Sequence, residues 1–218
     1  MKEAISPAEA AALIPDGATL LIGGFMGVGS PHRLIEALVT AGRRDLTVIA
    51  NDTAMPGKGI GHLITARAVR RVIASHIGLN PETQAQMIAG EIEVELVPQG
   101  TLIERIRAGG VGLGGVLTAT GLGTPVEEGK RQIEVDGKTY LLETPLRGDF
   151  ALIGCHQADY VGNLEYSLTA HNFNPIIALA ADQVIAEPRT IVPVGVIPPD
   201  SVETPGVLVD HLIERAPL

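Results

Sequence analysis

The chain of 218 residues contains one cysteine, Cys155, no tryptophan and only 3% aromatic residues. A single cysteine excludes an internal disulfide and cannot build a zinc site by itself. The six histidines are dispersed, with no pair four residues apart, so we expect no metal centre. Because aromatic residues are so few, Ala, Val, Ile and Leu must fill the interior, which suits a sheet covered by helices on both faces.

Long runs of one kind of residue are also missing. No run of Lys or Arg exceeds two residues, and the formal net charge is -9. Nucleic-acid binding usually needs a basic face, so we expect no nucleic-acid partner. No uninterrupted apolar stretch reaches the roughly twenty residues of a membrane span. The N-terminal residues show no signal-peptide core, so we expect a cytoplasmic location and no contact with a membrane.

Segments typical of strands and helices alternate along the first half of the chain. Apolar runs predict strands at residues 18–22, 46–50, 71–75 and 92–97. Helical spacing and capping residues predict helices at residues 7–14, 31–39 and 60–66, from residue 81 onward, and at 101–107. This alternation with short links predicts a mostly parallel sheet with right-handed crossovers. Further strands are expected at residues 150–155 and 184–187, a helix at 174–181, and an irregular segment at 188–205.

The alternation breaks between about residues 109 and 147. Residues 109–115 are so rich in glycine that we expect a loop there. Asp136-Gly137, flanked by residues 132–135 and 138–142, is a strong signal for a hairpin. We therefore predict one domain over residues 1–218, with an excursion from the sheet at roughly residues 109–147.

A glycine-rich turn at residues 23–29 follows the first long predicted strand, and Ser30-Pro31 begins the next helix. In open α/β sheets, ligands bind beyond the carboxyl end of a strand, where N–H groups at a helix N-terminus can face an anion. The turn lacks both the Lys-Ser/Thr pair of a Walker loop and the G-x-G-x-x-G spacing of a dinucleotide site. From the residues alone, a ligand-binding loop and a tight turn without a ligand remain equally open.

The pattern of Asp16-Gly17, aliphatic residues 20–22, Gly23-Gly24-Phe25 and Gly29-Ser30-Pro31 resembles the signature of family I CoA-transferase alpha subunits. Further segments resemble family motifs in the expected order, at residues 51–52, 75–78, 97–101, 121–124, 162–164, 172–175 and 204–206. The likeness is strongest to bacterial acetate (acetoacetyl-CoA) and 3-oxoacid CoA-transferases. It implies a three-layer α/β fold with an open, mostly parallel sheet.

The resemblance also implies an activity and a partner. Enzymes of this family move CoA from an acyl-CoA to a short-chain carboxylate by a ping-pong route through a glutamate. That glutamate belongs to the beta half of the enzyme, within a glutamate-glycine motif, and these 218 residues offer no convincing counterpart. We therefore expect the subunit without the nucleophile, paired with a beta subunit as alpha2-beta2. CoA and acyl-CoA are then substrates, and no separate cofactor is expected.

Two side chains at predicted strand ends are candidates for the active site. Gln99 follows the strand at 92–97, and its amide can donate to a developing oxyanion; the resemblance gives it a catalytic contribution. Asn51 follows the strand at 46–50 and is equally open to substrate binding or to capping a loop. His76 is more often a structural residue at such a place, and Cys155 is expected in the core. The resemblance assigns CoA binding to Gly24, Phe25, Met26, Gly27, Val28, Gly29 and Ser30.

Two other functions fit the same kind of sheet. A sugar-phosphate isomerase needs an acid–base pair within one chain, and no paired carboxylates lie at the predicted strand ends. A non-catalytic acyl-CoA-binding protein would need no such groups. An assay for CoA transfer with and without a glutamate-bearing partner separates all three functions.

Overall fold

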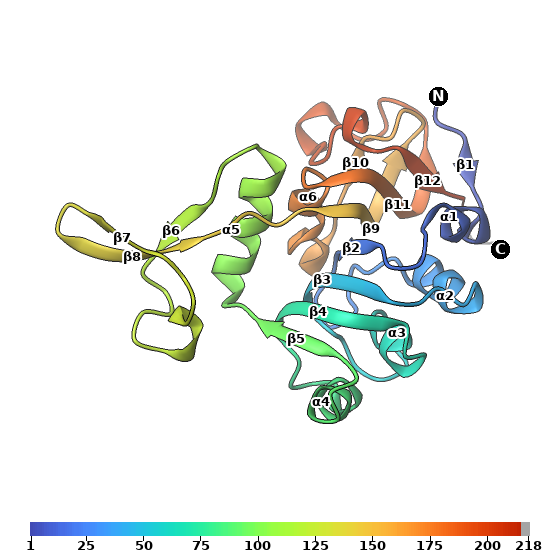
Figure 1. Cartoon of the computed structure of the whole chain (residues 1–218). Helices are drawn as coiled ribbons and strands as arrows, with labels where there is room; N and C mark the ends of the chain where they lie inside the picture. The colour runs from blue at the N-terminus through green and yellow to red at the C-terminus, as the bar shows by residue number, and fades with distance from the viewer. Residues whose placement is uncertain (215–218) are drawn as a thin grey trace.

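The structure, a computed structural model, describes residues 1–214, and its centre is a mostly parallel sheet (Figure 1). The strands of this sheet are β1 (Ala4–Ile5), β2 (Thr19–Ile22), β3 (Leu46–Asp52), β4 (Val69–His76), β5 (Glu93–Leu96), β9 (Gly148–Asp159), β10 (Leu164–Glu165), β11 (Ala181–Val192) and β12 (His211–Ile213). Their order is β1-β12-β11-β9-β2-β3-β4-β5, with β10 paired to β9. In the described residues every pairing in this sheet is parallel except that of β10 with β9.

Helices cover both faces of the sheet and make three layers, as the sequence predicts. The helices are α1 (Pro7–Leu13), α2 (His32–Thr40), α3 (Gly61–Thr65), α4 (Pro81–Ile88), α5 (Gln99–Gly110) and α6 (Asn174–Ile177). One hydrophobic cluster lies between the sheet and α1, α2 and α3, and a second lies under α5 and α6. Short 3-10 turns are η1 (Pro125–Glu127), η2 (Leu168–His171), η3 (Pro199–Ser201) and η4 (Gly206–Leu208). No helix in residues 1–214 has the length and hydropathy to cross a bilayer.

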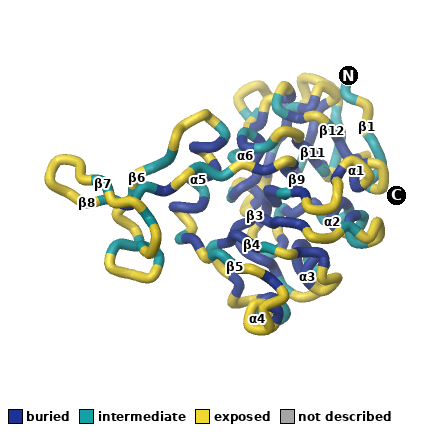
Figure 2. Tube along the Cα trace, viewed as in Figure 1, coloured by how far each residue is buried: buried dark blue, intermediate teal, exposed yellow. Residues whose placement is uncertain are grey.

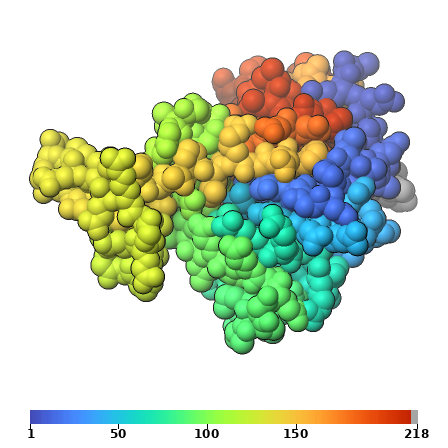
Figure 3. Space-filling model, in the orientation of Figure 1, coloured from blue at the N-terminus to red at the C-terminus, as the bar shows by residue number. Residues whose placement is uncertain are grey.

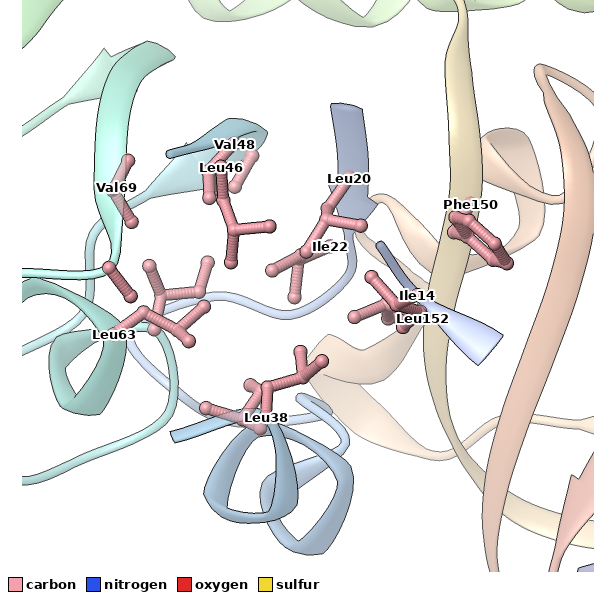
Figure 4. Packing of buried hydrophobic residues seen from close by; sticks show 14 of the residues in the cluster. Ile14, Leu20, Ile22, Leu38, Leu46, Val48, Leu63, Val69, Phe150 and Leu152 are labelled. Atoms are coloured by element: carbon pink, nitrogen blue, oxygen red, sulfur yellow. The ribbon is translucent and has the colours of Figure 1, made fainter. Parts of the chain in front are cut away.

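The central strands are apolar on both sides because each side faces a layer of helices. In β2, Leu20 and Ile22 belong to the cluster beneath α1–α3, whereas Leu21 belongs to the cluster beneath α5 and α6. Successive side chains of a strand point to opposite faces, so a doubly covered strand reads as a continuous apolar run. Val48 and Ile49 of β3 divide in the same way. Figure 4 shows the first of these clusters closely packed around Ile22.

The excursion forms an arm that projects from the body (Figures 1 and 3). Its strands are β6 (Val116–Thr118), β7 (Gln132–Val135) and β8 (Lys138–Glu143), which form an antiparallel sheet in the order β6-β8-β7. The predicted hairpin is confirmed, since Asp136 and Gly137 turn the chain with φ angles of 50° and 68°. Most of the arm is exposed, in contrast to the buried strands of the body (Figure 2).

Two local predictions were wrong. Gly109 and Gly110 end α5 and are not part of a loop. A Cβ atom on Gly109 would lie 2.1 Å from the carbonyl oxygen of Leu146, so close backbone approach explains the glycine. The segment after Glu187 is also more regular than expected, because β11 continues through Pro188 to Val192. There β12 no longer pairs with β11, so the missing N–H of Pro188 costs no ladder hydrogen bond on that side.

Candidate active site

Two tight loops meet at the carboxyl edge of the sheet. Residues 23–31 join β2 to α2, and residues 53–60 join β3 to α3. Each loop reverses within two residues, with Phe25 bridged to Val28 in the first and Met55 bridged to Lys58 in the second. Because β2 and β3 are parallel neighbours, the two loops emerge side by side. A Cβ atom on Gly59 would lie 3.4 Å from Cα of Gly27, so the loops are in contact.

Hydrogen bonds within the protein already use part of the glycine loop. The N–H groups of Phe25 and Val28 donate to each other's carbonyl oxygens at 2.9 and 2.8 Å. The N–H group of Met26 donates to Asp52 Oδ2 at 3.0 Å. In residues 1–214 the N–H groups of Gly24, Gly27, Gly29 and Ser30 have no acceptor. These four amides are the ones left for a ligand.

The N-terminus of α2 is occupied by a side chain of the protein. The carboxylate of Glu187 on β11 accepts the N–H groups of Arg33 at 3.2 Å and Leu34 at 2.9 Å. Nε of Arg33 approaches the same carboxylate at 3.4 Å. A negative charge is stabilised at this end of a helix by the helix dipole and the free N–H groups. Glu187 therefore takes the position that a ligand anion could have at the N–H groups of Arg33 and Leu34.

A chain of hydrogen bonds links Gln99 to the glycine loop through Asn51 and Asp52. Nε2 of Gln99 donates to Oδ1 of Asn51 at 2.5 Å, and Nδ2 of Asn51 donates to Oδ2 of Asp52 at 2.7 Å. The carboxylate of Asp52, which is only 6% exposed, also accepts the N–H groups of Met26 and Ala54. A carboxylate only accepts hydrogen bonds, so Asp52 fixes the amide orientation of Asn51, and Asn51 fixes that of Gln99. Within residues 1–214 the second N–H of Gln99 has no acceptor, so it can donate to a ligand.

The structure brings both candidate side chains together, although their positions differ slightly from the prediction. Asn51 lies within β3 and is buried, whereas the sequence placed it just after the strand. Gln99 is the first residue of α5, and its side chain reaches back to Asn51. A cavity of about 340 Å³, here called the amide cavity, is lined by Phe25, Gln99, Leu168, Thr169, His171 and Asn172. His76 ends β4 and lines neither this cavity nor the larger one described below.

The remaining residues of the glycine loop line a second cavity. This space of about 670 Å³, here called the cationic cavity, is lined by Gly27, Val28, Gly29, Ser30, His32, Arg33, Lys58, Gly154, Cys155, His156, Ser167, Leu168, Ala170, Glu187, Pro188 and Arg189. Leu168 lines both cavities. Its φ angle is 55° and its side chain is 83% exposed, so an apolar side chain stands at the boundary between them.

Sequence reasoning missed the segment that separates the two cavities. Residues 168–172 form η2 and its end, and buried Asn174 holds this segment in place. Nδ2 of Asn174 donates to the carbonyl oxygens of Gly29 and Ala170, both at 2.9 Å, and Oδ1 accepts the N–H of Gly154 at 3.2 Å. The only sequence signal was the motif at residues 172–175, in which Asn174 read as a helix cap. Asp52 was missed too, because its role depends on contacts with Met26 and Asn51 together.

Cys155 lies at the wall of the cationic cavity but is not a nucleophile. Burial, and to a smaller degree the charge of Glu187, raise the pKa of its thiol well above the usual range. A thiol held in its protonated form is a poor nucleophile. The expectation that Cys155 is a small core residue agrees with its 5% exposure.

Comparisons with known proteins agree on one family. Residues 4–215 match the family described as Coenzyme A transferase. The chain is 60% identical over 205 residues to the acetate CoA-transferase subunit alpha of Escherichia coli, covering 94% of this chain and 93% of that protein. It is 50% identical over 200 residues to the acetoacetyl-CoA:acetate/butyrate CoA transferase alpha subunit of Clostridium acetobutylicum, covering 92% of each.

A solved structure shows the same architecture within a longer chain. The crystal structure of an acyl-CoA transferase from Escherichia coli superposes with a TM-score of 0.85 at 26% sequence identity. The match covers 97% of this chain but 46% of that one, so the chain spans less than half the length of the solved transferase.

Proposed function

The chain belongs to the coenzyme A transferase family, and from this premise we propose that it forms one half of an active site that a glutamate-bearing beta subunit completes. It is the alpha-type subunit of such an enzyme. The observation that carries the proposal is the free N–H of Gln99 in the amide cavity, held by Asn51 and Asp52. Within residues 1–214 this cavity offers a hydrogen-bond donor but no carboxylate.

The absence of a suitable carboxylate supports a partner that supplies it. No Asp or Glu of residues 1–214 lines the amide cavity. The nearest carboxylate along the hydrogen-bond chain, Asp52, already accepts three N–H groups. Phe25 and Leu168 line the cavity with exposed apolar side chains, 38% and 83% exposed, which a partner surface would cover. These features support the proposal that the beta subunit supplies the nucleophile.

We propose that the reaction follows a ping-pong route. The glutamate carboxylate of the beta subunit attacks the thioester carbonyl of acyl-CoA and expels the CoA thiolate, which leaves an acyl-glutamyl anhydride. The thiolate then attacks the glutamyl carbonyl and expels the acyl group as a free carboxylate, which leaves a glutamyl-CoA thioester. A second carboxylate reverses these steps and leaves as the new acyl-CoA.

Each attack places negative charge on a carbonyl oxygen, and Gln99 is suited to meet it. A preorganised donor aimed at that oxygen stabilises the transition state more than the ground state. The amide of Gln99 is neutral and cannot protonate the attacking carboxylate. Asn51, which is 2% exposed and lines neither cavity, acts in this arrangement by holding Gln99. The free amides of the glycine loop bind the CoA substrate.

The test uses the chain alone and with its partner. The purified chain is expected to leave acetoacetyl-CoA and acetate unchanged, and to transfer CoA when the beta subunit is added. A beta subunit in which the glutamate is replaced by glutamine is the control and should give no transfer. Robust turnover by the isolated chain, free of beta subunit, would show that the nucleophile lies in this chain.

The family assignment does not define the acceptor carboxylate, the assembly or the cellular location. We propose a short-chain carboxylate such as acetate or acetoacetate as the acceptor, an alpha2-beta2 assembly, and a cytoplasmic location. The family assignment argues against the sugar-phosphate isomerase, and the transfer assay tests the non-catalytic alternative. Mass measurement of the purified complex, and kinetics with a series of carboxylates, test the assembly and the acceptor.

A further inference from the structure

The cationic cavity has a charge that differs from that of the whole chain. The chain has a formal net charge of -9, yet Lys58, Arg189 and the imidazoles of His32 and His156 line this cavity of about 670 Å³. Within residues 1–214 neither Lys58 nor Arg189 has a carboxylate within 4.0 Å. The cavity's one acidic residue, Glu187, is engaged by Arg33 and by the amides of α2. Two positive charges therefore lack a counter-ion.

Lys58 is held at the cavity by the fold of the glycine loop. A Cβ atom on Gly27 would lie 2.9, 3.0 and 3.1 Å from Cγ, Cε and Cδ of Lys58, so the stem of the lysine lies directly on this glycine. The tight turn at residues 55–58 fixes the other end of the stem. The ammonium group is thus carried on a packed stem, not on a freely moving surface chain.

Arg189 and His156 line the cavity from two adjacent strands of the sheet. Pro188 and Thr190 of β11 pair with Cys155 and Gln157 of β9, so Arg189 and His156 are neighbours in adjacent strands. The N–H groups of Gly29 and Ser30 add hydrogen-bond donors on the loop side. Cations and amide donors from three elements thus converge on one space.

From these observations we propose that the cationic cavity binds a phosphate-bearing ligand, with Lys58 and Arg189 as its charged contacts. Multiply charged phosphate groups suit two cations and several amide donors better than a single carboxylate does. The volume lies in the range of small-molecule sites, and it far exceeds the space acetate needs. Leu168 borders both cavities, so the phosphate site adjoins the amide cavity.

Two sources can supply such a phosphate. One is the nucleotide end of the CoA substrate, an assignment that rests on the proposed function. The other is a free phosphate or nucleotide bound independently of transfer. The chemistry of recognition is the same in both cases, and kinetics with substrates that differ only in the nucleotide end distinguish them.

The first measurement is calorimetric binding of ADP and of CoA to the assembled complex. Variants Lys58→Met and Arg189→Met keep the apolar stem and remove the charge, and Lys138→Met removes an exposed cation on the arm as a matched control. Loss of one charge-assisted contact is expected to weaken binding about tenfold. Lys138→Met should leave binding unchanged. Equal thermal melting of all variants confirms that folding is intact.

The second measurement compares KM for acetoacetyl-CoA with KM for an acetoacetyl-pantetheine thioester, which has no nucleotide end. If the phosphates of CoA bind here, each variant raises KM for acetoacetyl-CoA about tenfold and leaves the pantetheine substrate unaffected. If the variants bind ADP more weakly but keep the wild-type KM for both substrates, the ligand is a separate phosphate or nucleotide. If neither binding nor KM changes, the proposal is overturned. Turnover of the pantetheine substrate at the wild-type rate would then show that the proposed transfer function still stands.

Discussion

The two cavities at the carboxyl edge of the sheet differ in charge although they share one glycine loop. Phe25 lines the amide cavity, and residues 27–30 of the same loop line the cationic cavity. In the amide cavity the hydrogen-bond donor at the centre of the proposed chemistry is a neutral side-chain amide, Gln99. In the cationic cavity, Lys58 and Arg189 are charged and have no acidic partner in residues 1–214. One short loop thus borders two different electrostatic environments.

This difference suits two different tasks. A permanent anion such as a phosphate is held best by permanent charges, which stabilise it equally in every step. A cation beside the attacking carboxylate would stabilise that nucleophile before it reacts and would gain nothing in the transition state. A neutral amide aimed at the developing oxyanion favours the transition state instead. The separation of charge between the cavities is therefore the feature that mutations should test.

The largest effect is expected from Gln99→Ala in the assembled complex. Loss of one oxyanion donor costs about 3–4 kcal/mol in other enzymes. A donor shared with the partner can cost less, so we expect formation of the enzyme–CoA thioester to slow at least about tenfold, near 1.4 kcal/mol. The affinity of the complex for acyl-CoA should equal that of the wild type. Rapid-quench kinetics of thioester formation, compared with equilibrium binding, measure the two quantities.

The control for this variant is Gln183→Ala, which removes an exposed glutamine of β11 that lines neither cavity. It should leave both quantities unchanged. If Gln99→Ala lowers only affinity, or leaves the rate of thioester formation at the wild-type value, then Gln99 positions the substrate or the fold and does not meet an oxyanion.

Asn174→Ala is expected to weaken the boundary between the cavities. It removes three hydrogen bonds, two of them buried, to Gly29, Ala170 and Gly154, and leaves their backbone groups without these partners. Each such loss costs about 1–3 kcal/mol, so we expect the free energy of unfolding to fall by about 3 kcal/mol, the lower end for three hydrogen bonds. Urea denaturation of the purified chain measures this change.

The neighbouring Asn172→Ala is a matched control, because Nδ2 of Asn172 is buried without a hydrogen-bond partner in residues 1–214. Its free energy of unfolding should change little. Equal destabilisation by both variants would contradict the assignment of Asn174 as the residue that joins the glycine loop, η2 and β9.

Asp52→Asn should have a smaller effect, limited to the chemical step. Asparagine can donate as well as accept, so it no longer forces the amide of Asn51 into one orientation, and Gln99 loses its fixed direction. We expect kcat to fall about threefold to tenfold, less than the full loss of one donor, with KM for acyl-CoA unchanged. Asp45→Asn, at an exposed residue before β3, is the control. A rise in KM with unchanged kcat would contradict a positioning role.

The sequence predicted the parts of this site that depend on local patterns. Strands β2 and β3 are apolar on both faces, so their runs and ends could be located, and the ends carry the glycine loop and Asn51. The position of Gln99 could be predicted in the same way, because it comes shortly after the end of β5. The hairpin of the arm was marked by Asp136-Gly137, whose positive φ angles suit those residues.

The parts that sequence did not predict depend on contacts between distant segments. Glu187 accepts hydrogen bonds from the first turn of α2, although it lies 154 residues after Arg33 and 153 residues after Leu34 in the sequence. No local pattern could therefore show that this helix terminus is occupied. Leu168 adopts a positive φ angle although nothing in its type favours one. The glycines at 109 and 110 looked like a loop because sequence does not show that Leu146 and Leu179 pack against them.

The smallest expected effect, from Gly27→Ala, asks whether the glycine loop and the cationic cavity depend on each other. Gly27 and Gly17 have the same φ angle of 79°, so alanine should strain both backbones equally, by about 1–2 kcal/mol. They differ in surroundings: a Cβ on Gly17 meets nothing within 4 Å, whereas a Cβ on Gly27 meets the stem of Lys58. Gly27→Ala should therefore displace the ammonium group and raise KM for acyl-CoA about threefold, less than complete loss of a charged contact. Gly17→Ala should lower the melting temperature alike and leave KM unchanged. Identical KM values for the two variants would show that the fit of Lys58 on Gly27 has no part in binding.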